Sequence, residues 1–216
     1  PSGSGKGTLA RAIAKKLNWN ILDSGSLYRI VGLHAHSFDV SVEDDDALKQ
    51  VVESLDIQFA NERRPNIVVN GRDVTQAIRG EEATRYASLV AKREKVRAAL
   101  LVRQKEFRRP PGLVADGRDM GTVVFPDAKL KIYLDASPEE RARRRYAELK
   151  DKGLNVSLPD LFQSLKERDA QDKNRRVSPL KVAPDAFVLD STGLSIAEVI
   201  AQALAAAKQK GLQITN

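Results

Sequence analysis

The sequence predicts an α/β fold in which helices flank a mainly parallel sheet. Short apolar runs with strand character alternate with helical patterns, and a glycine-rich loop runs directly into the first helix. Strand patterns at 57–59 and 67–69 are followed by Asn70-Gly71, a strong hairpin signal, so we also expect an antiparallel insert at about 52–75. With 216 residues, 42% of them apolar, the chain suits one sizeable domain with its own core.

The glycine-rich loop has the pattern of a phosphate-binding loop. Its residues are Ser2, Gly3, Ser4, Gly5, Lys6, Gly7 and Thr8. The glycines let backbone N–H groups turn toward phosphate oxygens, and the lysine reaches the β- and γ-phosphates. Thr8 opens a helix whose positive N-terminal end favours an anion, and Leu9, Ile13 and Leu17 recur at helical spacing. A flexible linker does not account for that pattern.

Two features of the loop set expectations beyond it. Gly7 stands where the pattern has a serine or threonine that binds magnesium directly, so we expect magnesium to be held through waters. The pattern also calls for an earlier glycine and a strand that feeds the loop, and we expect both upstream of Pro1.

Four predicted strands, at 20–23, 112–116, 129–135 and 186–190, each end in aspartate. Ligands of such sheets bind beyond the carboxyl ends of the strands. The sequence therefore places polar groups at the edge of the sheet where a ligand is expected.

Helix starts are also signalled. Ser137-Pro138-Glu139-Glu140 and Ser195-Ile196-Ala197-Glu198 both have the pattern of a capping box. Ser41 with Asp44 is predicted to cap an acidic helix that runs to about Leu55.

Candidate binding residues follow the strands. Arg118 and Asp119 project from a tight turn after the strand at 112–116, where the alternative is a surface turn with a self-paired Arg–Asp. Arg29 lies one helical turn after the strand at 20–23 and can face a second phosphate, or be a solvated helix arginine.

Arg168, Asp172 and Arg175 have the spacing i, i+4 and i+7 and are predicted to share one helix face. Arginines stabilise the negative charge of a phosphoryl group in transfer. The alternative is a salt-bridge ladder worth only about 0.3–0.5 kcal/mol.

Charge and composition narrow the function classes. The net charge of +7 favours anionic partners, and the basic run at 141–145 suits either a nucleic-acid patch or an arm that closes over phosphates. Aromatic content is 5%, without a stacking platform for single strands, and 29 residues are acidic. Because the sequence has no cysteine, it offers no disulfide or thiolate metal site. It also contains no run of about 18 apolar residues, the length that a membrane-spanning helix needs. His34 and His36 are read as ordinary helix residues.

Four segments together resemble bacterial cytidylate kinases of the P-loop nucleoside monophosphate kinase family. They are residues 2–8, 22–29, 115–126 and 167–169, and the resemblance extends over nearly the whole chain. It implies a kinase core at 1–26, 110–143 and 157–216, a CMP-binding arm at 27–109 that carries the insert, and a short lid at 144–156.

The resemblance implies ATP-dependent, magnesium-dependent phosphorylation of CMP and dCMP. The loop residues 2–8 then bind ATP, and the implied catalytic residues are Lys6, Arg118, Arg168 and Arg175. The residues implied to hold the CMP phosphate or the transferring group are Ser24, Tyr28, Arg29, Arg118 and Arg175. Those implied to read the cytosine are Ser88, Arg97 and Asp119, and those implied to contact the sugar are Arg168 and Asp172.

No protein side chain is expected to bind the metal directly. We expect a cytoplasmic monomer without nucleic-acid or membrane partners. Two alternatives stay open: a kinase of another nucleoside monophosphate, UMP or AMP, and a nucleotide-gated nucleic-acid-binding protein.

Overall fold

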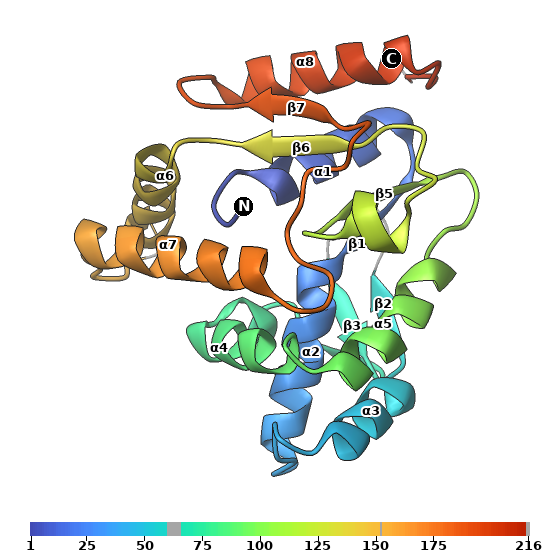
Figure 1. Cartoon of the computed structure of the whole chain (residues 1–216), viewed down its shortest axis with the longest axis vertical. Helices are drawn as coiled ribbons and strands as arrows, with labels where there is room; N and C mark the ends of the chain where they lie inside the picture. Colours follow the sequence, from blue (N-terminus) through green and yellow to red (C-terminus); the bar gives the residue numbers. More distant parts are fainter. Residues whose placement is uncertain (60–65, 152, 215–216) are drawn as a thin grey trace. The chain divides into compact units, whose positions relative to one another are not determined.

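The computed structural model describes residues 1–59, 66–151 and 153–214, and it divides into two compact units (Figure 1). The first unit comprises Pro1–Leu17 and Arg118–Asn216, and the second comprises Asn18–Gly117. Three parts of the predicted segments lie outside the described residues: 60–65 of the insert, 152 of the lid and 215–216 of the core.

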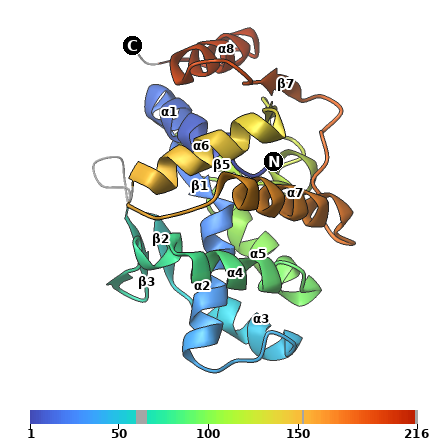
Figure 2. The ribbon, with the colours of Figure 1, turned by 90° about the vertical axis from the view of Figure 1, so that its left-hand side faces the viewer.

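In the described part of the second unit, residues 18–59 and 66–117, four α-helices accompany a pair of parallel strands. The strands are β1 (Asn20–Asp23) and β5 (Leu113–Asp116), and the helices are α2 (Ser24–Ser37), α3 (Asp45–Ser54), α4 (Glu81–Val90) and α5 (Glu94–Glu106). Helix α2 packs against α4 and α3 packs against α5 (Figure 2). The largest fully buried side chains here are Leu22, Ser26, Leu27, Val31, Leu48, Val52, Leu55, Val90, Val96, Leu100 and Gln104.

The antiparallel insert is confirmed, and outside residues 60–65 it has three strands, β2 (Ile57–Phe59), β3 (Ile67–Val69) and β4 (Arg72–Asp73). Asn70 and Gly71 join β3 to β4 with φ values of 49° and 78°, as a two-residue hairpin turn requires. The predicted start at residue 52 was too early, because α3 continues to Ser54.

The connection into β5 is packed against a tryptophan. A Cβ atom at Gly112 would lie 2.3 Å from the indole ring of Trp19, so only glycine fits beneath that ring. The side-chain amide of Asn20 donates to the carbonyl of Gly112 at 3.0 Å. The start of β1 and the start of β5 are therefore held together by both contacts.

In the first unit, helix α1 (Lys6–Leu17) follows the glycine-rich loop, and the parallel strands are β6 (Ile132–Asp135) and β7 (Phe187–Asp190). The other helices are α6 (Pro138–Asp151), α7 (Leu158–Asn174) and α8 (Ile196–Gln209). Helix α8 packs against α1 and β7, and α6 packs against α7 (Figure 1). The predicted apolar face of α1 is buried through Leu9, Ile13 and Leu17. A short π-helical turn occurs at Met120–Val124, and the second unit has a 3₁₀ turn at Ala77–Arg79.

Parallel pairing of the predicted strands is confirmed, and the four strands form two two-stranded sheets, one in each unit. The strand register places Asp23 opposite Asp116 and Asp135 opposite Asp190. The strand predicted at 129–135 begins only at residue 132, because its partner β7 itself begins at Phe187.

The helix starts follow the predicted caps with one difference. Both halves of the capping box at Ser195 and Glu198 are present, and Asp44 caps α3. At α6, the Ser137 hydroxyl accepts from the Glu140 N–H, but the Glu140 carboxylate binds Arg144 instead of returning to the cap.

Across residues 1–59, 66–151 and 153–214, no helix is both long and apolar enough to cross a membrane.

Candidate functional site

The glycine-rich loop folds back on its own first residue. The Ser4 hydroxyl donates to the carbonyl of Pro1 at 3.1 Å, and the Lys6 ammonium donates to the same oxygen at 2.7 Å. Gly3 and Gly5 have φ values of 76° and 89°, which glycine adopts without strain. The first turn of α1 contains no acidic residue, so nothing there offsets the positive end of the helix dipole. The predicted loop geometry therefore suits an anion.

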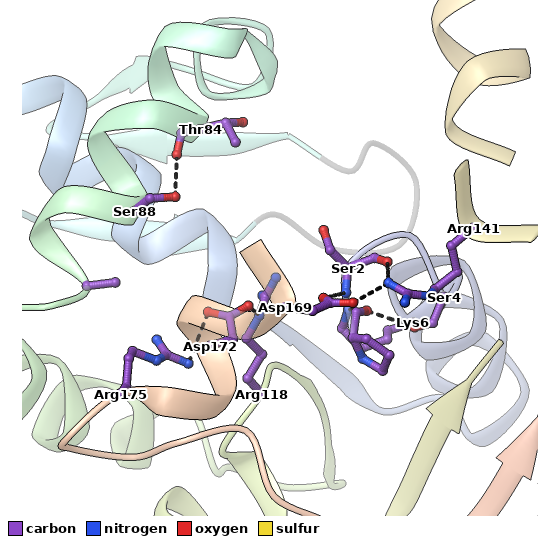
Figure 3. Close-up of polar contacts among 12 residues, drawn as sticks. Ser2, Ser4, Lys6, Thr84, Ser88, Arg118, Arg141, Asp169, Asp172 and Arg175 are labelled. Atoms are coloured by element: carbon purple, nitrogen blue, oxygen red, sulfur yellow. Dashed lines mark hydrogen bonds and ion pairs between the residues drawn. The ribbon is translucent and has the colours of Figure 1, made fainter. Parts of the chain in front are cut away.

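The loop backbone is also held from outside by two helices. The Ser2 N–H donates to the Asp169 carboxylate at 3.0 Å, and the Arg141 guanidinium donates to the Ser2 carbonyl at 2.9 Å (Figure 3). Arg141 also donates to Asp169, so the three groups close a ring. The Ser2 N–H, predicted to face a nucleotide phosphate, is thus engaged by a carboxylate.

Sequence reasoning assigned Arg141 only to the basic run and gave Asp169 no role. Both are almost fully buried, at 5% and 7% exposure. One signal for Asp169 was present, since it is the last residue of the Glu167-Arg168-Asp169 segment that carries the family resemblance.

A second cluster in the same unit joins three of the predicted residues. Asp172, on α7, accepts from the Arg118 guanidinium and lies 3.3 Å from the guanidinium of Arg175 (Figure 3). Each of the three side chains is at most 16% exposed. The structure therefore brings two predicted phosphate-binding arginines to one carboxylate.

One geometric expectation for this cluster was wrong. Helix α7 ends at Asn174, and Arg175 has φ −58° and ψ 138°, so it does not continue the helix face of Arg168 and Asp172. Its contact with Asp172 is made from the residue that follows the last helical turn. Arg168 itself lies half-buried on α7.

Asp119 lies beside this cluster in sequence and is 5% exposed. Its carbonyl accepts from the N–H groups of Val123 and Val124, at 2.9 and 3.1 Å, and so anchors the π-helical turn that follows. The position of Asp119 is therefore fixed by backbone bonding rather than left on a mobile loop.

The second unit carries the other predicted substrate residues. Ser24 and Arg29 lie on α2, Ser24 as its buried first residue and Arg29 half-buried. The Arg97 guanidinium lies 5.3 Å from the centre of the Tyr28 ring, and both side chains are buried. The Ser88 hydroxyl donates to the carbonyl of residue 84, one turn earlier on α4. The structure thus joins Tyr28 to Arg97 and places Ser88 on the helix that packs against α2.

The basic run on α6 is largely occupied by internal partners. Arg144 binds Glu140 and the loop residue Ser191, and Arg145 binds Glu148. With Arg141 in the buried ring, these contacts leave little of the run for a nucleic-acid backbone.

Burial raises the pKa of the Tyr133 phenol above its ordinary value, and the carboxylates of Asp135 and Asp169 raise it further.

Among residues 1–59, 66–151 and 153–214, no group of three or more His, Asp or Glu side chains is placed to hold a metal ion.

Comparison with known proteins gives full-length matches. A family model described as cytidylate kinase matches residues 1–209. A cytidylate kinase of Stutzerimonas stutzeri (strain A1501) is 54% identical over 215 residues, which cover 98% of this chain and 94% of the relative. Those of Aeromonas salmonicida (strain A449) and Proteus mirabilis (strain HI4320) are 52% and 51% identical, over 97% of this chain and 92% and 93% of the relatives. The matches extend through both units.

Proposed function

This chain belongs to the cytidylate kinase family, and from that membership we propose that it transfers the γ-phosphoryl group of ATP to CMP. The observation that carries the proposal is sequence identity of about one half, along nearly the whole chain, to proteins named cytidylate kinase. The parallel strand pairs, the flanking helices and the antiparallel insert agree with a nucleoside monophosphate kinase.

ATP binds through the loop at residues 2–8. The positive end of α1 and the Lys6 ammonium attract the β- and γ-phosphates, and Lys6 exchanges its contact with the Pro1 carbonyl for the phosphate. The Ser2 amide is the exception, since its N–H already donates to Asp169. Ser2 therefore contributes to the loop's shape, and the N–H groups after it contact the phosphates.

We assign CMP binding to the residues that the family resemblance implies. The phosphate of CMP is held by Ser24, Tyr28, Arg29, Arg118 and Arg175. The base is read by Ser88, Arg97 and Asp119, and the sugar is contacted by Arg168 and Asp172. Two observations support this assignment: Arg97 is pre-positioned against Tyr28, and Arg118 and Arg175 converge on Asp172.

The chemistry needs no general base, because the attacking oxygen of CMP is a phosphate oxygen that is already ionised at neutral pH. A bond forms between this oxygen and the γ-phosphorus while the bond to the bridging β–γ oxygen breaks, which gives CDP and ADP. Negative charge spreads over the transferring group, and preorganised arginines stabilise it. Closure of the arm at 27–109 and the lid at 144–156 excludes water, which otherwise hydrolyses ATP.

Magnesium enters with ATP. No cluster of metal-binding side chains is present in the described residues, and glycine follows Lys6 where a hydroxyl ligand is otherwise found. This donor set fits an ion held by phosphate oxygens and waters, which magnesium readily keeps. A bound magnesium ion would neutralise charge on the phosphates, while Lys6 and the loop amides would hold the phosphates in place.

The direct test is a coupled assay of ADP formation with CMP, dCMP, UMP and AMP as acceptors. We expect turnover with CMP and dCMP, and a much lower kcat/KM with UMP and AMP. The Lys6→Ala variant is the negative control, because it lacks the ammonium that reaches the donor phosphates. Preference for UMP or AMP over CMP would replace this proposal with a different monophosphate kinase. Size-exclusion chromatography with light scattering tests the further expectation of a monomer.

A further inference from the structure

A buried ion pair binds both backbone polar groups of one residue in the phosphate loop, Ser2. Asp169 on α7 accepts the N–H of Ser2, Arg141 on α6 donates to the carbonyl of Ser2, and the two side chains bind each other (Figure 3). Arg141 also donates through Nε to the carbonyl of Ala136 at 3.0 Å. Both hydrogen-bonding groups of one loop residue are thus satisfied by a pair of oppositely charged side chains.

We propose that Arg141 and Asp169 are positioning residues that hold the phosphate loop in its ATP-binding shape and thereby set the affinity for ATP. This inference rests on the proposed function, since it concerns the donor site of the same reaction. Neither residue has to touch the nucleotide, because both act through the Ser2 backbone.

Packing supports the same conclusion. Gly3, which follows Ser2, has a φ of 76°, and a Cβ there would lie 3.3 Å from both the Cβ and the carbonyl oxygen of Arg141. The loop therefore lies directly on the first turns of α6. Fixing a backbone residue costs conformational entropy, so a loop that is ordered in advance binds its ligand with a smaller entropic penalty.

Removal of Arg141 and removal of Asp169 are expected to affect ATP binding unequally, because the two side chains carry opposite charges. The carboxylate of Asp169 lies against a loop that receives phosphates, and only the charge of Arg141 neutralises it within the ring. Removal of Arg141 leaves a buried anion that repels ATP and lacks its main partner, whereas removal of the Asp169 charge leaves a cation. The loss of Arg141 is therefore expected to harm ATP binding more, and neutralising Asp169 as well is expected to recover part of that loss.

The test uses the full chain with three variants: Arg141→Gln, Asp169→Asn and the double variant. Matched controls are Arg11→Gln on α1 and Asp160→Asn on α7, both exposed positions in the same unit. The readouts are KM for ATP and for CMP, kcat, the Kd of ATP by calorimetry without CMP, and hydrogen exchange of the loop amides.

We expect Arg141→Gln to raise the KM and Kd for ATP about tenfold or more, and Asp169→Asn to raise them less. The double variant is expected to bind ATP more tightly than Arg141→Gln alone. Exchange of the loop amides quickens in the single variants, while the KM for CMP and the two controls stay near wild type.

A lowered melting temperature with unchanged KM and Kd for ATP would overturn the inference and leave the pair a purely structural role. If the losses of ATP binding free energy in the two single variants simply added up in the double variant, the coupling between Arg141 and Asp169 would be overturned. If Arg141→Gln does not fold, the comparison of Asp169→Asn with Asp160→Asn decides the question. If the wild-type chain makes no CDP, the proposed function fails, yet the calorimetric comparison with ATP still tests the pair.

Discussion

Neutralising Asp172 is expected to destabilise the protein and at the same time to create an anion site. The carboxylate lies between the guanidiniums of Arg118 and Arg175, and the three side chains are 13–16% exposed. Asp172→Asn keeps the shape of the side chain but removes its charge. The amide oxygen can still accept from one arginine, while the amide NH₂ faces the other.

The size of the effect follows from that geometry. Removing one partner of a buried ion pair typically costs about 3–5 kcal/mol, and we take the lower end, about 3 kcal/mol, because one acceptor survives. At about 2–4 °C per kcal/mol for a chain of this length, the melting temperature falls by about 6–12 °C. The matched control is Asp185, whose side chain is 59% exposed in its ion pair with Lys131, and Asp185→Asn is expected to cost less than about 1 kcal/mol.

Thermal unfolding is followed with and without sodium sulfate, against sodium chloride at equal ionic strength. Sulfate stabilises most folded proteins. The informative quantity is therefore the rise in melting temperature caused by sulfate in the variant, minus the same rise in the wild type. We expect sulfate to raise the melting temperature of Asp172→Asn more than that of the wild type, because two arginines that have lost a shared carboxylate can bind the anion. The reasoning is refuted if Asp172→Asn costs no more than Asp185→Asn, or if sulfate stabilises variant and wild type equally.

Three further predictions concern rate, base choice and pH. Arg175→Ala is expected to lower kcat by about 10²–10³ while KM for CMP changes little, as for a group that acts on transition-state charge; a change in KM alone would make it a binding residue. Asp119→Asn is expected to lower kcat/KM for CMP and to reduce the ratio of kcat/KM for CMP to kcat/KM for UMP. The reason is that the carboxylate accepts a hydrogen bond from the cytosine amino group and repels the uracil carbonyl oxygen. An unchanged ratio would mean that Asp119 does not read the base. Bonds from Ser195 hold the pKa of Glu198 below its ordinary value of 4.5, so its stabilisation is present above that pH and is lost as pH falls through the lower folded value. The melting temperatures of wild type and Glu198→Ala should therefore converge in acid, and a constant difference across pH would contradict this.

The parts of the fold that depend on near neighbours were predictable from the sequence. The phosphate loop, the Asn70-Gly71 turn and the capping box at Ser195 are each specified within a few residues, and all three are present. The aspartates at strand ends were also informative, because parallel strands in register bring them to the same edge.

The parts that failed depend on residues far apart in the chain. Arg141 and Asp169 are 28 residues apart, and nothing in a basic run distinguishes the arginine that is almost fully buried from its less buried neighbours. The contact between Arg118 and Asp172 spans 54 residues. The position of Arg175 was missed for a different reason: helix α7 ends without a glycine at its C-terminus, so the spacing alone suggested one more helical residue.

The tryptophan that precedes β1 gives this protein a built-in spectroscopic reporter. Trp19 is the only tryptophan of the chain, and its ring lies on Gly112 within the second unit. Its fluorescence therefore reports on the environment at the start of β1 and β5, whereas far-ultraviolet circular dichroism averages over the helices of both units. Coincident melting curves from the two signals would mean that the units unfold as one cooperative system, and separated curves would give the stability of the second unit on its own.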